Sequence, residues 1–420
     1  MRDLDSFLHS IGMHPEQTDI FATTESFIDE INKGLAGENS SLRMIPTYIS
    51  AKGIAPDNKP VVAIDAGGTN LRAAVVTFRS GEVLVEQLKR YPMPGSTEEI
   101  DVFEFFDRLA DIILPLCSDS GYISFCFSYP AEIFPNRDGK ILQLNKEVRV
   151  RGAEGVVLGE TLLAKLHEKG LQKHMEFTLL NDTAAGLMGG AATLSLSHCD
   201  GLAGLILGTG NNSCYMERGE KILKLPNAKD MIINCESGVF DKAFRGVSDR
   251  LTDECSEIPG DHLLEKMISG VYHGRLITNT VRLAAEAGLL SDGFKGDYPY
   301  FSTPELDDFL RGADNRVSQM CTPEDAETLR LIIDRSFERA ARLVCANIAA
   351  LCLHCDGGRE PEHPFCVLAE GSTFYNSLLF RDKLNKYLES HILQKLSRYI
   401  VCMRAENSTL AGAALAALIN

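Results

Sequence analysis

Residues 61–72 read VVAIDAGGTNLR, an apolar run that ends in Asp65 and is followed by two glycines. Glycines at a strand end let backbone N–H groups approach a polyphosphate closely, and the Asp65 carboxylate can orient a hydrated Mg²⁺. The same letters also suit an ordinary hairpin turn, so this segment alone leaves both interpretations open. The motif GxxxxGK[ST] occurs nowhere in the chain, which excludes a P-loop protein.

A second segment, residues 179–184 (LLNDTA), ends another apolar run with Asp182. A carboxylate in this position can accept a proton from a substrate hydroxyl during phosphoryl transfer. It can equally cap the N-terminus of the helix that follows, and the segment alone favours this simpler interpretation.

Two further segments place small, turn-forming residues after apolar runs. Residues 204–214 (GLILGTGNNSC) repeat the turn type of the first segment, and residues 367–373 (VLAEGST) offer backbone against which a nucleoside can lie flat. Each segment is a weak signal on its own, and the last has a helix cap as its alternative. Together the four segments predict a phosphate cradle with one carboxylate free for chemistry, as in an enzyme that transfers a phosphoryl group.

The order of the expected elements indicates an internal duplication. Strand, Gly-rich turn, strand occurs around residues 67–68 and again around 208–210, and each is followed by helix, strand and a pivotal residue. Residues 1–50 have helical spacing, 262–290 and 323–354 are long helical patterns, and the chain ends in a small-residue helix, STLAGAALAALI.

Composition limits the function classes. A chain of 420 residues predicts two or three domains, and a formal net charge of -16 argues against nucleic acid or an anionic membrane as a partner. No apolar run approaches a membrane span, and the N-terminus does not read as a secretory signal, so we expect a cytoplasmic protein. The 12 cysteines are then expected to be reduced core residues, including the CxxC of Cys352 and Cys355.

The four segments, in this order, resemble the sugar kinase, Hsp70 and actin superfamily, and within it the hexokinase family. DAGGTNLR is similar to that family's DLGGTNFR, LLNDTAAGLM to VVNDTVGTMM, and LGTGNNSCYME to VGTGCNACYME. FCFSYP, LNKEVRVRGAEG, INCESGVFD and ENSTLAGAALAAL also resemble family motifs, so the resemblance runs from about residue 61 to the end.

The resemblance implies an α/β chain with the two-domain, actin-like (ribonuclease H-like) sugar kinase fold and a central cleft. We expect a small domain at residues 55–180 that regains the C-terminal helix 407–420, and a large domain at 181–406 on which the segment 1–54 packs. It implies ATP and Mg²⁺ as cofactors and a hexose substrate, glucose first, in a monomer or homodimer. A kinase of another sugar and a sugar sensor without turnover remain alternatives.

The resemblance also implies roles for individual residues. Asp182 would be the base that deprotonates the sugar 6-hydroxyl, and Asp65 would hold Mg²⁺ through water. The expected sugar ligands are Ser128, Asn145, Lys146, Asn181, Asn212 and Glu236. The expected nucleotide ligands are Asp65, Gly67, Gly68, Thr69, Asn70, Arg72, Gly208, Thr209, Gly210, Gly371 and Ser372. Arg72 has bracing of the hairpin as an equal alternative.

The chain departs from the family pattern on the sugar side. In SGVYHGRLIT, Arg275 stands where the family's GGKYMGELVR has a glutamate, taken here as its second sugar-binding acid. A guanidinium reverses the charge and offers no acceptor. Arg275 could pair with Glu236, it could select a different or acidic sugar, or Glu265 could serve instead from the same helix; the first interpretation is preferred.

Overall fold

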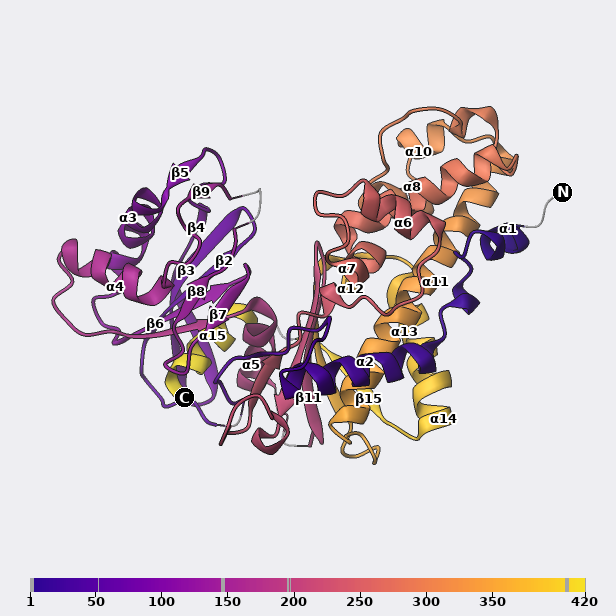
Figure 1. Ribbon diagram of the computed structural model, residues 1–420. Coiled ribbons are helices and arrows are strands. Elements are labelled where there is room, and N and C mark those ends of the chain that lie inside the picture. The colour runs from indigo at the N-terminus through magenta and orange to yellow at the C-terminus, as the bar shows by residue number, and fades with distance from the viewer. Residues whose placement is uncertain are drawn as a thin grey trace.

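The computed structural model describes residues 4–51, 53–144, 148–194, 196, 198–404 and 408–419. The chain forms two lobes that lie side by side, each built on one sheet (Figure 1). The sheet of the smaller lobe has the order β10-β6-β2-β3-β4. Its strands are β2 (Val61–Gly67), β3 (Asn70–Arg79), β4 (Glu82–Pro92), β6 (Tyr122–Phe127) and β10 (Glu176–Leu180).

The sheet of the larger lobe has the order β1-β13-β12-β11-β14-β15. Its strands are β1 (Ile45–Pro46), β11 (Gly201–Leu207), β12 (Asn211–Glu217), β13 (Met231–Asn234), β14 (Phe365–Glu370) and β15 (Ile400–Met403). The short strand β1, in a region expected to be helical, pairs antiparallel with β13 and ties the N-terminal segment to this lobe.

The two sheets repeat one topology, which confirms the predicted duplication. In each, a hairpin (β2–β3 or β11–β12) carries an antiparallel strand on one side (β4 or β13). Two parallel strands lie on its other side, β6 and β10 in one sheet and β14 and β15 in the other. The Gly-rich turns of both hairpins therefore occupy equivalent places.

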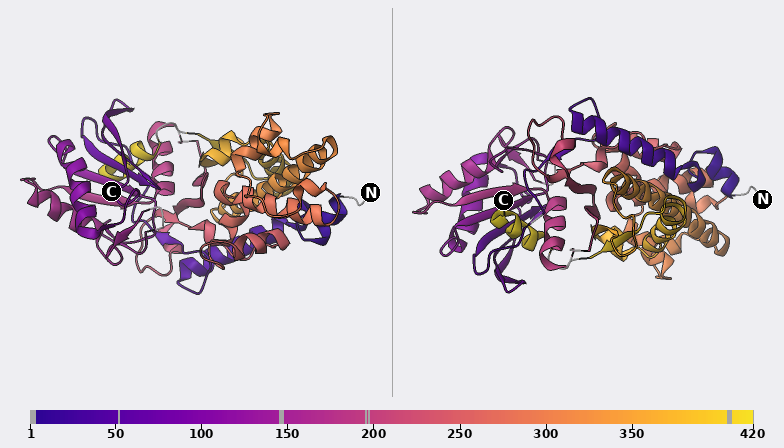
Figure 2. Two further views of the ribbon diagram at one scale, coloured as in Figure 1. Left: turned by 90° about the horizontal axis from the view of Figure 1, so that it is seen from above. Right: turned by 90° about the horizontal axis from the view of Figure 1, so that it is seen from below.

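The helices cover the sheets and fill the larger lobe. The smaller lobe has α3 (Val102–Ile113), α4 (Leu158–Glu168) and the short strands β5 (Ile100–Asp101), β7 (Ala131–Ile133), β8 (Gly139–Ile141) and β9 (Val150–Arg151). The larger lobe has α1 (Leu4–Ser10), α2 (Ile20–Ala36), α6 (Val247–Glu254), α7 (Leu263–Ile268), α8 (Gly270–Glu286), α9 (Thr303–Leu310), α10 (Arg316–Gln319), α11 (Pro323–His354), α12 (Ser372–Asn376), α13 (Phe380–Tyr387) and α14 (Gln394–Leu396). Helix α1 lies at the outer end of this lobe (Figure 2).

Local sequence explains where the long helices begin and end. Helix α2 starts after Asp19, whose carboxylate caps two N–H groups, and ends at Ala36, where Gly37 follows with φ 76°. Helix α11 starts with a capping box between Thr322 and Asp325 and packs against α2. The pattern at 262–290, however, forms two helices, because Ser269 is extended and separates α7 from α8.

Helices α5 (Asp182–Thr193) and α15 (Ser408–Ile419) pack on each other where the two lobes meet. Helix α5 follows β10 of the smaller lobe and packs on β11 and β12, while α15 lies on β2 and β6. The two helices pack closely enough that a methyl group added at Gly412 would overlap the Ala185 carbonyl oxygen. Their apolar residues form a separate buried cluster with the facing strands. The domain boundaries given above, 55–180 with 407–420 and 181–406, remain a prediction.

The cysteine prediction is wrong for one pair. Cys199, in the connection between α5 and β11, forms a disulfide with the buried Cys366 of β14, across a Cα–Cα distance of 5.9 Å. Cys352 and Cys355 are free thiols at the C-terminal end of α11, as expected of helix-borne cysteines. Among the residues that the structure describes, none of the helices combines the length and apolarity needed to cross a bilayer.

Candidate active site

Asp182 lies where β10 passes into α5. Asn181, the residue before it, is the N-cap of α5, and its side-chain oxygen accepts the Thr183 N–H at 2.8 Å. Asp182 is the first helical residue, and one of its oxygens accepts the same N–H at 2.7 Å. The residue that caps α5 is therefore Asn181, and Asp182 is the first residue of the helix.

The environment of Asp182 opposes its charge. The pKa of Asp182 is raised to about 6, chiefly by burial and to a smaller extent by the nearby Asp65 and Glu236 carboxylates, while a hydrogen bond from the Ser128 hydroxyl works in the opposite direction. A base whose pKa lies near neutral pH combines an ionised form with a useful affinity for a proton. Asp65 belongs to the smaller lobe and Glu236 to the larger, so Asp182 lies where the two lobes meet.

Asp65 is braced by Arg72 across the first hairpin. The two residues face each other in the β2–β3 register, and Nε and Nη2 of Arg72 both donate to Oδ2 of Asp65, with Nε at 2.9 Å. Bracing is thus the role that the geometry gives Arg72. It holds the Asp65 carboxylate in place and leaves Oδ1 as the oxygen able to meet a ligand.

The turn of this hairpin presents backbone to the junction. Gly68 has φ 54°, a left-handed conformation that favours glycine, and its carbonyl accepts a hydrogen bond from Tyr129. A Cβ at Gly67 would lie 3.3 Å from the Ser128 hydroxyl oxygen, so this turn and the end of β6 lie side by side. Thr69 and Asn70 are exposed at the tip.

The second hairpin turn, residues 208–210, packs against Gly371. Gly371 has φ 111°, and a Cβ on Gly208 would lie 3.3 Å from its Cα, so the two backbones touch. The Gly208 carbonyl also accepts the Thr373 hydroxyl at 3.0 Å. Thr209 and Ser372 remain exposed. The structure thus brings together the two segments that the sequence assigned to phosphate and nucleoside.

Side-chain amides of Asn212 and Asn234 form a hydrogen-bond network that orients the Glu236 carboxylate. The side-chain N–H₂ of Asn234 donates to Glu236 at 2.7 Å, and that of Asn212 donates to the Asn234 oxygen at 2.8 Å and to Glu236 at 3.3 Å. Glu236 has φ 54°, a conformation that a non-glycine residue rarely adopts and that is often kept at functional sites. Asn234 is a member of this network that the sequence argument missed.

The Glu265 carboxylate, and not the Arg275 guanidinium, lies near Glu236. The Glu265 carboxylate accepts the Asn211 N–H at 2.9 Å, and burial together with the Glu236 charge raises its pKa. Among the described residues, no ion pair joins Arg275 to Glu236; the Arg275 guanidinium lies near two tyrosine rings instead. The preferred pairing is therefore wrong, and the alternative with Glu265 fits, although from α7 rather than from the helix of Arg275. Asn145 and Lys146 lie outside the described residues.

Comparison with known proteins agrees with this geometry. A family model described as hexokinase matches residues 4–192, and a second of the same description matches residues 202–419. The chain belongs to the hexokinase family. Hexokinase-1 of Schizosaccharomyces pombe is 28% identical, with 93% of this chain and 86% of that protein covered. Hexokinase-3 of Oryza sativa subsp. japonica is also 28% identical, with 94% and 86% covered.

The hexokinase fold is confirmed by a solved structure. The hexokinase from Schistosoma mansoni, complexed with glucose, matches with a TM-score of 0.80 at 24% identity and covers 99% of this chain and 98% of that one. The predicted fold class, an α/β sugar kinase of the actin-like type, therefore holds. As a member of the hexokinase family the chain is a kinase with ATP as a substrate.

Proposed function

We propose that the chain transfers the γ-phosphoryl group of ATP to the 6-hydroxyl of a hexose, glucose first, with Asp182 as the base. The observation that carries this proposal is the place of Asp182, at the start of α5 and among Ser128, Asp65 and Glu236. As the O6–P bond forms and the bond from phosphorus to the ADP oxygen breaks, the hydroxyl proton passes to the Asp182 carboxylate.

The sugar binds, in this proposal, to the polar groups on the side of Glu236. Carboxylates accept hydrogen bonds from hydroxyls, and side-chain amides both donate and accept, which suits a neutral polyol. The proposed ligands are Ser128, Asn145, Lys146, Asn181, Asn212, Glu236 and, from the structure, Glu265. Glu265 and Glu236 together supply acceptors and repel an acidic sugar.

The nucleotide binds, in this proposal, across the two hairpin turns. The turns at residues 67–70 and 208–210, which are exposed at Thr69, Asn70 and Thr209, can hold the phosphates, and Gly371 and Ser372 can meet the nucleoside. An oxygen of Asp65 that Arg72 does not occupy fits a Mg²⁺ ion held through water, since this ion prefers oxygen ligands and keeps several waters. When bound, Mg²⁺ would neutralise part of the negative charge of the phosphates.

A panel of sugars tests the proposal. Purified protein with Mg-ATP is assayed for ADP release on glucose, mannose, fructose, glucosamine and glucuronate. Turnover on the neutral hexoses and none on glucuronate is expected. Turnover on a different sugar alone would favour the second candidate, a kinase of that sugar. Sugar binding without turnover on any of them would indicate a sensor and contradict the proposal.

A further inference from the structure

Helix α8 begins against the second hairpin turn. The Gly270 N–H donates to the Gly208 carbonyl at 2.7 Å, and the Val271 N–H donates to the Thr209 carbonyl at 3.3 Å. The first turn of this 17-residue helix therefore lies beside residues 208–210, the loop proposed to hold phosphate. The side chain of Val271 is 49% exposed at this place.

Arg275 lies one helical turn beyond Val271 on the same face. Side chains four residues apart on a helix are neighbours, and they lean toward the helix N-terminus. The guanidinium carbon of Arg275 follows this rule, since it lies 5.9 Å from the centre of the Tyr272 ring, one turn back. The charged end of Arg275 is thus directed toward the end of α8 that contacts the loop.

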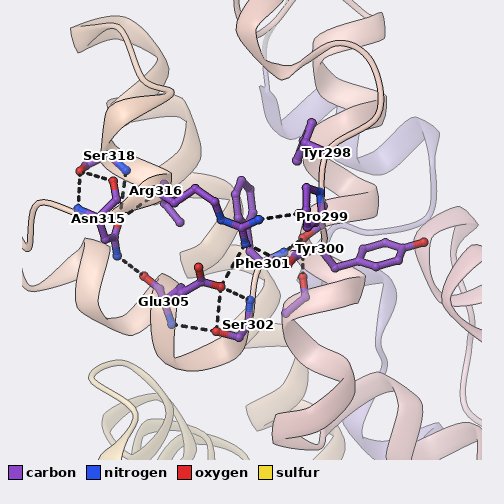
Figure 3. Close-up of polar contacts among 12 residues, drawn as sticks. Tyr298, Pro299, Tyr300, Phe301, Ser302, Glu305, Asn315, Arg316 and Ser318 are labelled. Atoms are coloured by element: carbon purple, nitrogen blue, oxygen red, sulfur yellow. Dashed lines mark hydrogen bonds and ion pairs between the residues drawn. The ribbon is translucent and has the colours of Figure 1, made fainter.

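A second aromatic ring supports the guanidinium. The Tyr300 ring centre is 5.8 Å from the guanidinium carbon of Arg275. Arg316 fixes the backbone of this segment by donating to the Pro299 carbonyl at 3.2 Å and to the Tyr300 carbonyl at 3.0 Å. The Tyr300 ring projects away from that polar network (Figure 3). The rings restrict Arg275 without neutralising its charge.

The site has several negative charges that a cation such as Arg275 can balance. Four carboxylates, Asp65, Asp182, Glu236 and Glu265, lie near one another. Arg72 is committed to Asp65, whereas Arg275 has no carboxylate partner among the residues that the structure describes. A nucleoside triphosphate adds further negative charge, so a cation without a carboxylate partner has an electrostatic use on the helix whose first turn contacts the phosphate loop.

We propose that Arg275 binds the polyphosphate of the nucleotide from the α8 side of residues 208–210. The proposal rests on the proposed nucleotide site and assigns a role to the residue at which the chain departs from its family pattern. An acidic sugar is the weaker candidate for this cation, because Glu236 and Glu265 face the sugar side.

Nucleotide binding by variants tests this role without depending on turnover. Isothermal titration measures the Kd of Mg-AMPPNP and of AMP for the full-length protein, Arg275→Gln and Arg275→Lys. Arg275→Gln is expected to weaken Mg-AMPPNP about tenfold and AMP hardly at all, with partial recovery in Arg275→Lys. The defect should shrink at high salt, since it is electrostatic. Glucose KM should not change.

Two further variants control for structure. Arg282→Gln removes another α8 arginine that contacts Tyr300, two turns farther from the loop, and should leave the Kd of Mg-AMPPNP unchanged. Adding Val271→Lys to Arg275→Gln returns a cation to the same face and should restore binding. An unchanged Kd in Arg275→Gln, or a rise in glucose KM instead, would overturn the role of Arg275. Failure of the unmodified protein to bind Mg-AMPPNP would instead overturn the proposed function.

Discussion

The Asp182 carboxylate changes its charge within the pH range in which cells operate. Burial and the charges of Asp65 and Glu236 place its pKa at about 6, well above the ordinary value of 3.8. As a base it is active only when ionised. We therefore expect kcat on glucose to fall as the pH drops below about 6, with a single proton responsible. A kcat that is flat from pH 7 to pH 5, measured with saturating substrates, would contradict this role.

The same pKa shift has a consequence for stability. Above pH 6 Asp182 is ionised in both the folded and the unfolded state, and the folded state is destabilised because it buries this charge near other carboxylates. Below about pH 4 Asp182 is protonated in both states, and this destabilisation is gone. Asp182→Asn should therefore raise the free energy of unfolding by about 1–3 kcal/mol at pH 7.5. The gain should disappear near pH 4. Urea unfolding at the two pH values measures it, and a loss of stability at pH 7.5 would contradict the account.

Glu265 provides a test of the sugar side. Glu265→Gln keeps the size and the acceptor for the Asn211 N–H but removes the charge. We expect KM for glucose to rise about tenfold or more, with KM for ATP nearly unchanged, because the side chain lies on the Glu236 side of the site. Glu254→Gln, an exposed change on α6, is the matched control. Equal KM values in the two variants would remove Glu265 from the sugar site.

At the scale of elements, the close crossing of α5 and α15 determines how the lobes are joined. A methyl group at Gly412 would overlap the backbone of α5 at Ala185 and Gly189, so Gly412→Ala should lower the free energy of unfolding by about 1–3 kcal/mol. Gly121→Ala is the control, since an added Cβ there meets no atom within 4 Å. The Tm values of the two variants are compared by thermal unfolding. Equal Tm values would show that α5 and α15 can move apart without loss of stability.

Sequence patterns predicted the elements whose causes are local. An apolar run that ends in Asp-Ala-Gly-Gly or Gly-Thr-Gly fixes a strand and its turn within a few residues, so both hairpins and their duplication could be predicted. The break between α7 and α8 could not, because the partner of the Gly270 N–H is Gly208, far away in the chain. Because of this break, Glu265 lies on α7 and not on the helix that carries Arg275. The Cys199–Cys366 disulfide joins residues 167 positions apart and left no local signal.

At the scale of the whole molecule, the site is shared between two equivalent halves. Asp65 lies on β2 and Ser128 follows β6 in one half, whereas Glu236 follows β13 and residues 208–210 join β11 to β12 in the other. Asp182 begins the helix that passes from the first sheet to the second. We infer that sugar binding draws the lobes together around the reacting groups and excludes water, as closure does in other kinases.

The role of Asp182 as the base is tested by the kcat of Asp182→Ala on glucose with Mg-ATP, measured together with the affinity of the same variant for glucose. Phosphorylation is expected to fall by a factor of about 100 or more while the variant stays folded and still binds glucose. Full turnover by a folded Asp182→Ala protein would contradict the assignment of the base, and with it the chemistry proposed for this site.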